Sequence, residues 1–209
     1  MKIPLFPLDV VLFPGAPLPL HIYEPRYREL VSECLLRSDV FGVVRAQREG
    51  LAVIGCTASI ATVINRYSDG RLDILCEGIE RFEIELLDNS RAFLQAEVDI
   101  LRDEEKFATR AQREECVALH FETLELVAGQ IENGPHDPSR NVPIDLDKPL
   151  SFQLAAVLPA DLAFKQELLT LNSDVSRTEC LLSFYNAILP KLRRGVQASR
   201  SAGRNGHVM

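Results

Sequence analysis

The chain has 209 residues, of which 46% are hydrophobic and 25% are charged, and its formal net charge at pH 7 is −7. These proportions are ordinary for a soluble globular protein, and the acidic excess argues against nucleic-acid binding through phosphate contacts. The sequence shows neither a signal peptide nor an apolar stretch near the roughly 20 residues that a membrane span needs. We therefore expect a cytoplasmic protein with one large domain or two small ones.

Six of the twelve prolines fall within the first 28 residues. Proline fixes φ and lacks a backbone N–H, so this region favours short edge strands over a long helix or a central strand. The pattern predicts strands at Val10–Phe13 and Leu18–Ile22, separated by a turn at Pro14-Gly15. A helix is expected from Pro25, because the apolar residues then follow helical spacing.

Residues 40–101 alternate between apolar and polar positions, which is typical of half-buried strands. Ser68-Asp-Gly-Arg71 has the composition of a tight hairpin turn. After the turn, Arg81 is expected on the polar, outward face of a strand. The whole region predicts an antiparallel meander that closes into a small barrel or a folded sheet. The expected strands are Val40–Arg45, Thr57–Tyr67, Leu72–Glu77, Arg81–Leu86 and Leu94–Ile100.

After Arg102 the apolar residues recur at helical spacing. A long helix is expected from Phe107 to Ile131, with a stop signal at Asn133-Gly134-Pro135. Shorter helices should follow at 147–157 and 162–171, the latter capped by Asp161, and a last one should begin at Ser173 or Asp174. The fold class is therefore α+β, with a β-rich lobe over 1–101, a helical lobe over 102–194 and a disordered tail over 195–209.

Common catalytic motifs are missing from the sequence, including phosphate-binding loops, the Gly-x-Ser-x-Gly elbow and His-Glu-x-x-His. The five cysteines are far apart, so we expect most of them to be small buried hydrophobes, not zinc ligands. Cys116 and His120, at i,i+4, could form half of a metal site, but a helix flank is favoured. His21 is expected to be a structural histidine. Lys165 is the best of several weak candidates for a catalytic lysine, and we expect no catalytic residue, metal or cofactor.

Aromatic and basic residues gather where the second strand meets the first helix. Arg26 could fix this corner by binding a carboxylate or exposed carbonyl groups, or it could contact a ligand. We take Tyr23, Arg26 and Tyr67 as the candidate binding residues.

The opening run from Pro4 to Tyr27, with its proline pattern, closely resembles the start of the Lon protease N-terminal domain family. Later segments are similar to the same family: Gly55-Cys-Thr-Ala-Ser-Ile-Ala, Gly78 with Arg81-Phe82, and Leu158-Pro-Ala-Asp161 followed by Lys165-Gln-Glu-Leu-Leu169. The resemblance covers roughly residues 3–192. It implies a pseudobarrel related to PUA domains, followed by a helical bundle, and a part in recognising protein substrates. The ATPase and serine-lysine protease modules of such proteases have no counterpart in this sequence.

Three functions compete at this point. The first is a non-catalytic module that binds proteins or exposed peptide segments, with no nucleic acid and no membrane as partner and with homo-oligomerisation left open. The alternative, by fold analogy alone, is a PUA-like RNA- or small-ligand-binding module. The third is a stand-alone peptidase, which the absence of an activated nucleophile disfavours.

Overall fold

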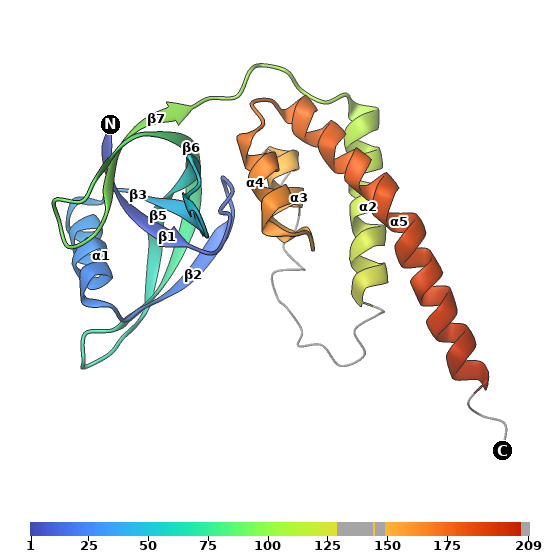
Figure 1. The fold of residues 1–209 in the computed structure, drawn as a ribbon, viewed down its shortest axis with the longest axis horizontal. Coiled ribbons are helices and arrows are strands. Elements are labelled where there is room, and N and C mark those ends of the chain that lie inside the picture. Colours follow the sequence, from blue (N-terminus) through green and yellow to red (C-terminus); the bar gives the residue numbers. More distant parts are fainter. Residues whose placement is uncertain (129–143, 145–148, 206–209) are drawn as a thin grey trace. The chain divides into compact units, whose positions relative to one another are not determined.

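The computed structural model describes residues 1–128, 144 and 149–205. The chain divides into two compact units (Figure 1). The first unit contains Met1–Asp103 and Ala160–Asn172, and the second contains Glu104–Pro159 and Ser173–Met209. Each unit has its own set of secondary-structure elements and is described separately below.

The first unit is built on a mixed seven-stranded sheet that closes on itself. Its strand order is β1-β7-β6-β5-β3-β4, β1 also pairs with β3 in parallel, and β2 pairs with β6. The ring of β1, β7, β6, β5 and β3 forms a small barrel, so the α+β class and the closed sheet are confirmed. The strands are β1 (Lys2–Leu8), β2 (Pro17–Ile22), β3 (Phe41–Gln47), β4 (Gly50–Leu51), β5 (Ile54–Arg66), β6 (Leu72–Asp88) and β7 (Gln95–Leu101).

The proline-rich opening forms a strand earlier than expected. β1 lies at Lys2–Leu8, whereas Val10–Phe13 contains no strand residue. β7 pairs with β1 only over Lys2–Pro4, and β3 pairs with it only over Leu5–Leu8. Each neighbouring strand therefore pairs with only part of β1. Pro4 and Pro7, which have no N–H group to donate, can then be accommodated although β1 lies between two strands. The predicted turn at Pro14-Gly15 and the second strand are both present.

β6 is one strand of 17 residues where the sequence suggested two. Its first half pairs with β2 and its second half with β7, while β5 runs along its other side. The change of partner occurs at Gly78, whose N–H donates to Ala16 and whose carbonyl accepts from Gly15. A Cβ at Gly78 would lie 2.2 Å from the carbonyl oxygen of Phe13, so only glycine allows this close approach.

Helix α1 (Pro25–Arg37) begins with the expected proline and buries its apolar face. Tyr27, Leu30, Val31 and Cys34 join a core cluster with residues of β1, β2, β3, β5 and β6. The ring of Tyr27 stacks on that of Phe6, with centroids 4.0 Å apart. A second cluster, around Phe82 and Ile3, fills the barrel near β7.

Helix α4 (Leu162–Thr170) belongs to the first unit, although the sequence placed it in the helical lobe. Its predicted cap is confirmed, because Asp161 Oδ1 accepts from the N–H of Phe164 at 2.9 Å. Gln166 Nε2 donates to the carbonyl oxygen of Ile54 on β5 at 2.9 Å. Arg81, expected to face solvent, is only 3% exposed, because it lies beneath this helix and hydrogen-bonds its C-terminal end.

The second unit consists of α2 (Arg110–Ala128), α3 (Leu150–Val157) and α5 (Asp174–Asn205). Helix α2 packs against α5, and Arg193 of α5 forms a bidentate ion pair with Glu122 of α2. Ser173 caps α5 by accepting from the N–H of Ser176. None of the helices in the described residues is long and apolar enough to cross a membrane.

The buried face of α2 differs from the predicted apolar stripe. Its buried residues are Cys116, His120 and Thr123, whereas Phe107 and Phe121 are exposed. His120 is therefore not a helix flank: its Nδ1 lies 2.8 Å from the hydroxyl of Tyr185, inside the unit. This polar pair can be buried between α2 and α5 because each side chain provides the hydrogen-bond partner of the other.

Two predictions concern the residues at which helices end. The predicted stop signal of the long helix, at residues 133–135, lies outside the described residues. The structure continues α5 to Asn205, where the sequence suggested a disordered tail from residue 195. Alanine, arginine and glutamine all tolerate a helix, so the lack of an apolar stripe did not prevent it from continuing.

Candidate functional site

Two of the three candidate binding residues expose aromatic rings on the first unit. Tyr23 connects β2 to α1 and is 61% exposed, and Tyr67 follows β5 and is 40% exposed. Arg26 lies in the first turn of α1. We next consider what holds each of these side chains in place.

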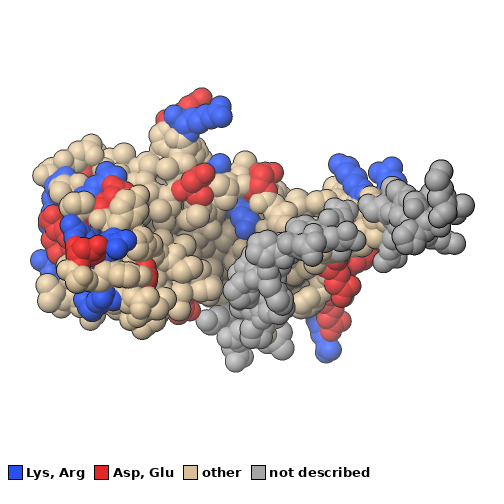
Figure 2. All heavy atoms as spheres, turned by 90° about the horizontal axis from the view of Figure 1, so that it is seen from below, with Lys and Arg blue, Asp and Glu red and all other residues tan. Residues whose placement is uncertain are grey.

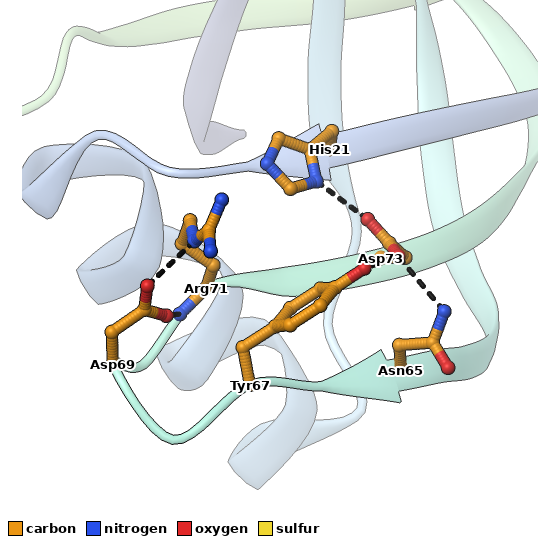
Figure 3. A network of polar contacts seen from close by, with 6 residues as sticks. All are labelled: His21, Asn65, Tyr67, Asp69, Arg71 and Asp73. Carbon is orange, nitrogen blue, oxygen red and sulfur yellow. Dashed lines mark hydrogen bonds and ion pairs between the residues drawn. The ribbon is translucent and has the colours of Figure 1, made fainter.

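The carboxylate of Asp73 on β6 receives three hydrogen bonds, one from β2, one from β5 and one from the residue that follows β5 (Figure 3). His21 Nδ1 of β2 lies 2.5 Å from Asp73 Oδ1 and donates to it, because a carboxylate can only accept. Asn65 Nδ2 of β5 and the Tyr67 hydroxyl both donate to Oδ2, at 2.9 and 2.7 Å. We call His21, Asn65, Tyr67 and Asp73 the Asp73 cluster.

The hydrogen bonds of the Asp73 cluster favour the ionised carboxylate. They lower the pKa of Asp73 to about 2, with the bond from His21 as the largest cause, followed by those from Asn65 and Tyr67. The same carboxylate raises the pKa of Tyr67, mainly because its hydroxyl donates to the charged oxygen. At neutral pH the cluster thus holds an anion and a neutral phenol, and Tyr67 has a fixed orientation.

The turn between β5 and β6 brings the Tyr67 hydroxyl within reach of the Asp73 carboxylate. Gly70 adopts a φ of 87°, as the predicted Asp-Gly turn requires. Arg71 donates from Nε to Asp69 Oδ2 at 2.7 Å, and its guanidinium carbon lies 5.0 Å from the ring centre of Tyr67. Arg28 of α1 donates to the carbonyl oxygen of Asp69 at 2.8 Å, which fixes the turn to the helix.

His21 links the two exposed tyrosines. Its ring lies 6.0 Å from that of Tyr23 in a stacked arrangement and 6.0 Å from that of Tyr67 in an edge-on arrangement. Arg26 instead contacts its own end of α1: its Nε donates to Glu24 at 2.9 Å, and its guanidinium lies over the ring of Tyr27. The structure therefore brings the rings of Tyr23 and Tyr67 close to the same histidine, while the contacts of Arg26 agree with its corner-fixing alternative.

The sequence interpretation missed the residue at the centre of this site. The alternating pattern gave Asp73 no role, whereas His21 agrees with the expectation of a structural histidine, because it hydrogen-bonds Asp73. The signal that could have found them is the hairpin turn, which sets the strand register and places Asn65 opposite Asp73. The pairing of His21 with Asp73 depends on β2 lying beside β6, which no local pattern predicts.

The described residues do not supply an evident catalytic centre. Among them, no group of three or more His, Cys, Asp and Glu side chains could hold a metal ion. Burial lowers the pKa of Lys165, the best of the weak lysine candidates, which lies on α4. Four cysteines, Cys34, Cys56, Cys76 and Cys116, are buried as expected. Burial raises the pKa of the Cys34 thiol to about 11 and that of Cys56 to about 12, so neither is a reactive thiolate.

One face of the first unit carries charges of both signs. In the view of Figure 2, Lys and Arg side chains of this unit alternate with Asp and Glu across the surface at the left. That face shows no continuous basic area of the kind that tracks a nucleic-acid backbone.

The comparisons with known proteins agree on one family. The model of the ATP-dependent protease La (LON) substrate-binding domain matches residues 2–187. The chain is 28% identical over 202 residues to a Lon protease of Amoebophilus asiaticus, which covers 90% of this chain and 24% of that protein. It is 35% identical over 109 residues to a Lon protease of Roseiflexus castenholzii, covering 48% of this chain and 14% of that protein. The chain thus spans about a quarter or less of these relatives.

Solved structures have the same fold. A Lon N-terminal domain protein from Xanthomonas campestris superposes with a TM-score of 0.68 at 24% identity, covering 88% of this chain and 98% of that one. The N-terminal domain of a Lon protease from the Mycobacterium avium complex gives a TM-score of 0.62 at 17% identity, covering 89% and 98%. With the family match over nearly the whole described chain, this protein belongs to the Lon substrate-binding domain family.

Proposed function

We propose that this chain is a non-catalytic module that binds unfolded or extended polypeptide segments, and that Tyr23 and Tyr67 contact the bound segment. Membership of the Lon substrate-binding domain family is the observation that carries the proposal. The site agrees with it, because the exposed rings of Tyr23 and Tyr67 each lie 6.0 Å from the ring of His21. Aromatic side chains supply large contact areas with few rotatable bonds, which suits them to protein recognition.

The Asp73 cluster supports this role by holding Tyr67 in place before binding. The Tyr67 hydroxyl is bound to Asp73, and its ring lies beside the Arg71 guanidinium. A side chain that is already ordered loses less conformational entropy when a partner binds. The ring of Tyr67 thus offers an apolar surface with a polar rim, which can accept different side chains from different polypeptides.

The experiment uses a reduced, carboxymethylated and therefore permanently unfolded test protein that carries a fluorophore. Fluorescence anisotropy gives its Kd for the full chain and for the Tyr23→Ala/Tyr67→Ala double variant. The matched control is Leu36→Ala, because Leu36 is 85% exposed and lies in the last turn of α1, outside the Asp73 cluster.

We expect the Kd to rise by about tenfold or more in the double variant and to stay within about twofold in the control. Equal Kd values for all three proteins would place the binding surface elsewhere. A chain that binds no unfolded protein would overturn the proposed function itself. Turnover of casein by the purified chain would instead favour the peptidase alternative.

A further inference from the structure

In the long hairpin of β5 and β6, β5 extends past β3, the strand on its other side. β3 pairs with β5 only over Cys56–Ala58, whereas β6 pairs with β5 from Ile54 to Arg66. All strand pairings of Ser59–Arg66 in the described residues are therefore with β6. The opposite side of this stretch is an open sheet edge, which presents backbone N–H and C=O groups to a possible partner.

The other open edges of the sheet offer less to a partner strand. β2 pairs with β6 alone among the described residues, and its Pro17 and Pro19 supply no N–H groups. β4 has two residues. The stretch Ser59–Arg66 has neither proline nor glycine and includes four β-branched residues, Ile60, Thr62, Val63 and Ile64. It is the edge whose composition favours an added strand.

The β5 edge is also accessible. The exposed residues are Ala61, Thr62, Ile64, Asn65 and Arg66, and Ile64 is 55% exposed although it is apolar. Ile64 and Ala61 are the extra residues at two irregularities in the pairing with β6. Such bulges twist an edge and keep it from forming long, flat stacks, so they favour pairing with one short segment over fibre-like assembly.

We infer that Ser59–Arg66 of β5 binds an extended polypeptide segment as an additional β-strand. This inference rests on the proposed function and specifies its mode: main-chain hydrogen bonds to the β5 edge hold the segment. Such bonds are independent of side-chain identity, which suits a module that accepts many sequences. Tyr67 directly follows Arg66, so the exposed ring lies at the end of the same edge and can contact a side chain of the bound strand.

The first test uses backbone methylation of the ligand and leaves the protein unchanged. The probe is a fluorescent peptide that alternates valine with threonine and lysine. Two further versions carry N-methyl groups on every second residue. One version is methylated at the odd-numbered positions and the other at the even-numbered positions. Successive N–H groups of a strand point to opposite sides, so only one set faces β5. We expect that version to bind the full chain about tenfold or more weakly than the unmodified peptide, and the other within about threefold.

The second readout is amide hydrogen exchange of the full chain with and without saturating unmodified peptide. Exchange of the amides in Ala61–Arg66 that face away from β6 should slow about tenfold, whereas Leu18 and Leu20 of β2, outside the Asp73 cluster, should keep their rates. Equal binding of all three peptides, or no binding of the unmodified peptide by a chain that still binds the unfolded test protein, would overturn the inference and leave the proposed function standing. Loss of binding to every probe would overturn both.

Discussion

Arg81, near the middle of β6, donates from Nη1 to the carbonyl oxygen of Leu169 at 2.8 Å, 88 residues further along the chain. The same nitrogen donates to the carbonyl oxygen of Leu171 at 2.8 Å, and Nη2 donates to Asp103 Oδ1 at 2.6 Å. The carbonyl groups at a helix C-terminus lack intrahelical partners and carry partial negative charge. One buried guanidinium therefore satisfies the end of α4 and attaches it to the barrel.

Replacement of Arg81 by alanine should destabilise the first unit by about 3–5 kcal/mol, because it leaves Asp103 and two carbonyl groups without this buried partner. Arg71→Ala is the matched control: Arg71 pairs with Asp69 at the surface, where such pairs contribute about 0–1 kcal/mol. Hydrogen exchange of slow β6 amides measures both changes within the unit itself. A loss below about 1 kcal/mol for Arg81→Ala would show that α4 does not depend on this contact.

The Asp73 cluster should make the stability of the first unit depend on pH in the acidic range. The folded-state pKa of Asp73 is about 2, below its ordinary value of 3.8, so its hydrogen bonds stabilise the fold above about pH 4. This contribution should be lost as the pH falls toward 2. Urea unfolding of the chain and of Asp73→Asn, at steps between pH 5 and pH 2, measures the difference. The two curves should converge on acidification; a gap that stays constant or widens would contradict the assignment.

The stability of the second unit should also fall on acidification, but over a different pH range. Burial lowers the pKa of His120 from 6.5 to about 4, so the unfolded chain binds a proton at a higher pH than the folded chain does. Stability should therefore fall as the pH drops from about 6.5 to about 4, by up to about 3 kcal/mol.

His120→Gln is the control for this effect, because it can keep a hydrogen bond to Tyr185 but has no titrating group. Hydrogen exchange of α5 amides, followed between pH 7 and pH 4 and corrected for the intrinsic rates, reports on this unit. The variant should lose the pH dependence over that range. An identical slope in both proteins would show that His120 is not its source.

Local patterns in the sequence predicted the elements that local physics determines. The Asp69-Gly70 turn, the proline at the start of α1 and the cap at Asp161 each depend on neighbouring residues, and each is present. The resemblance to Lon N-terminal domains supplied the family, which the family match confirms. Tyr23 and Tyr67 are both exposed, and their role in binding stays a prediction.

The features that sequence analysis missed depend on partners that are distant in the chain. Arg81 alternates with Phe82 as an outward residue should, but α4 covers it, and no periodic pattern shows which helix lies on a strand. β1 tolerates two prolines because its partners each pair with only part of it. α2 buries His120 in place of Phe121, because Tyr185 supplies the hydrogen-bond partner.

The four tyrosines provide the most direct test of polypeptide binding at Tyr23 and Tyr67. Two of them, Tyr23 and Tyr67, are exposed, whereas Tyr27 and Tyr185 are buried in separate units and act as internal controls. The measurement is the NMR spectrum of ¹³C-labelled tyrosine rings in the full chain during titration with the unfolded test protein. We predict that the Tyr23 and Tyr67 signals shift in a saturable way while those of Tyr27 and Tyr185 stay in place. Saturable binding with unchanged Tyr23 and Tyr67 signals would contradict the account.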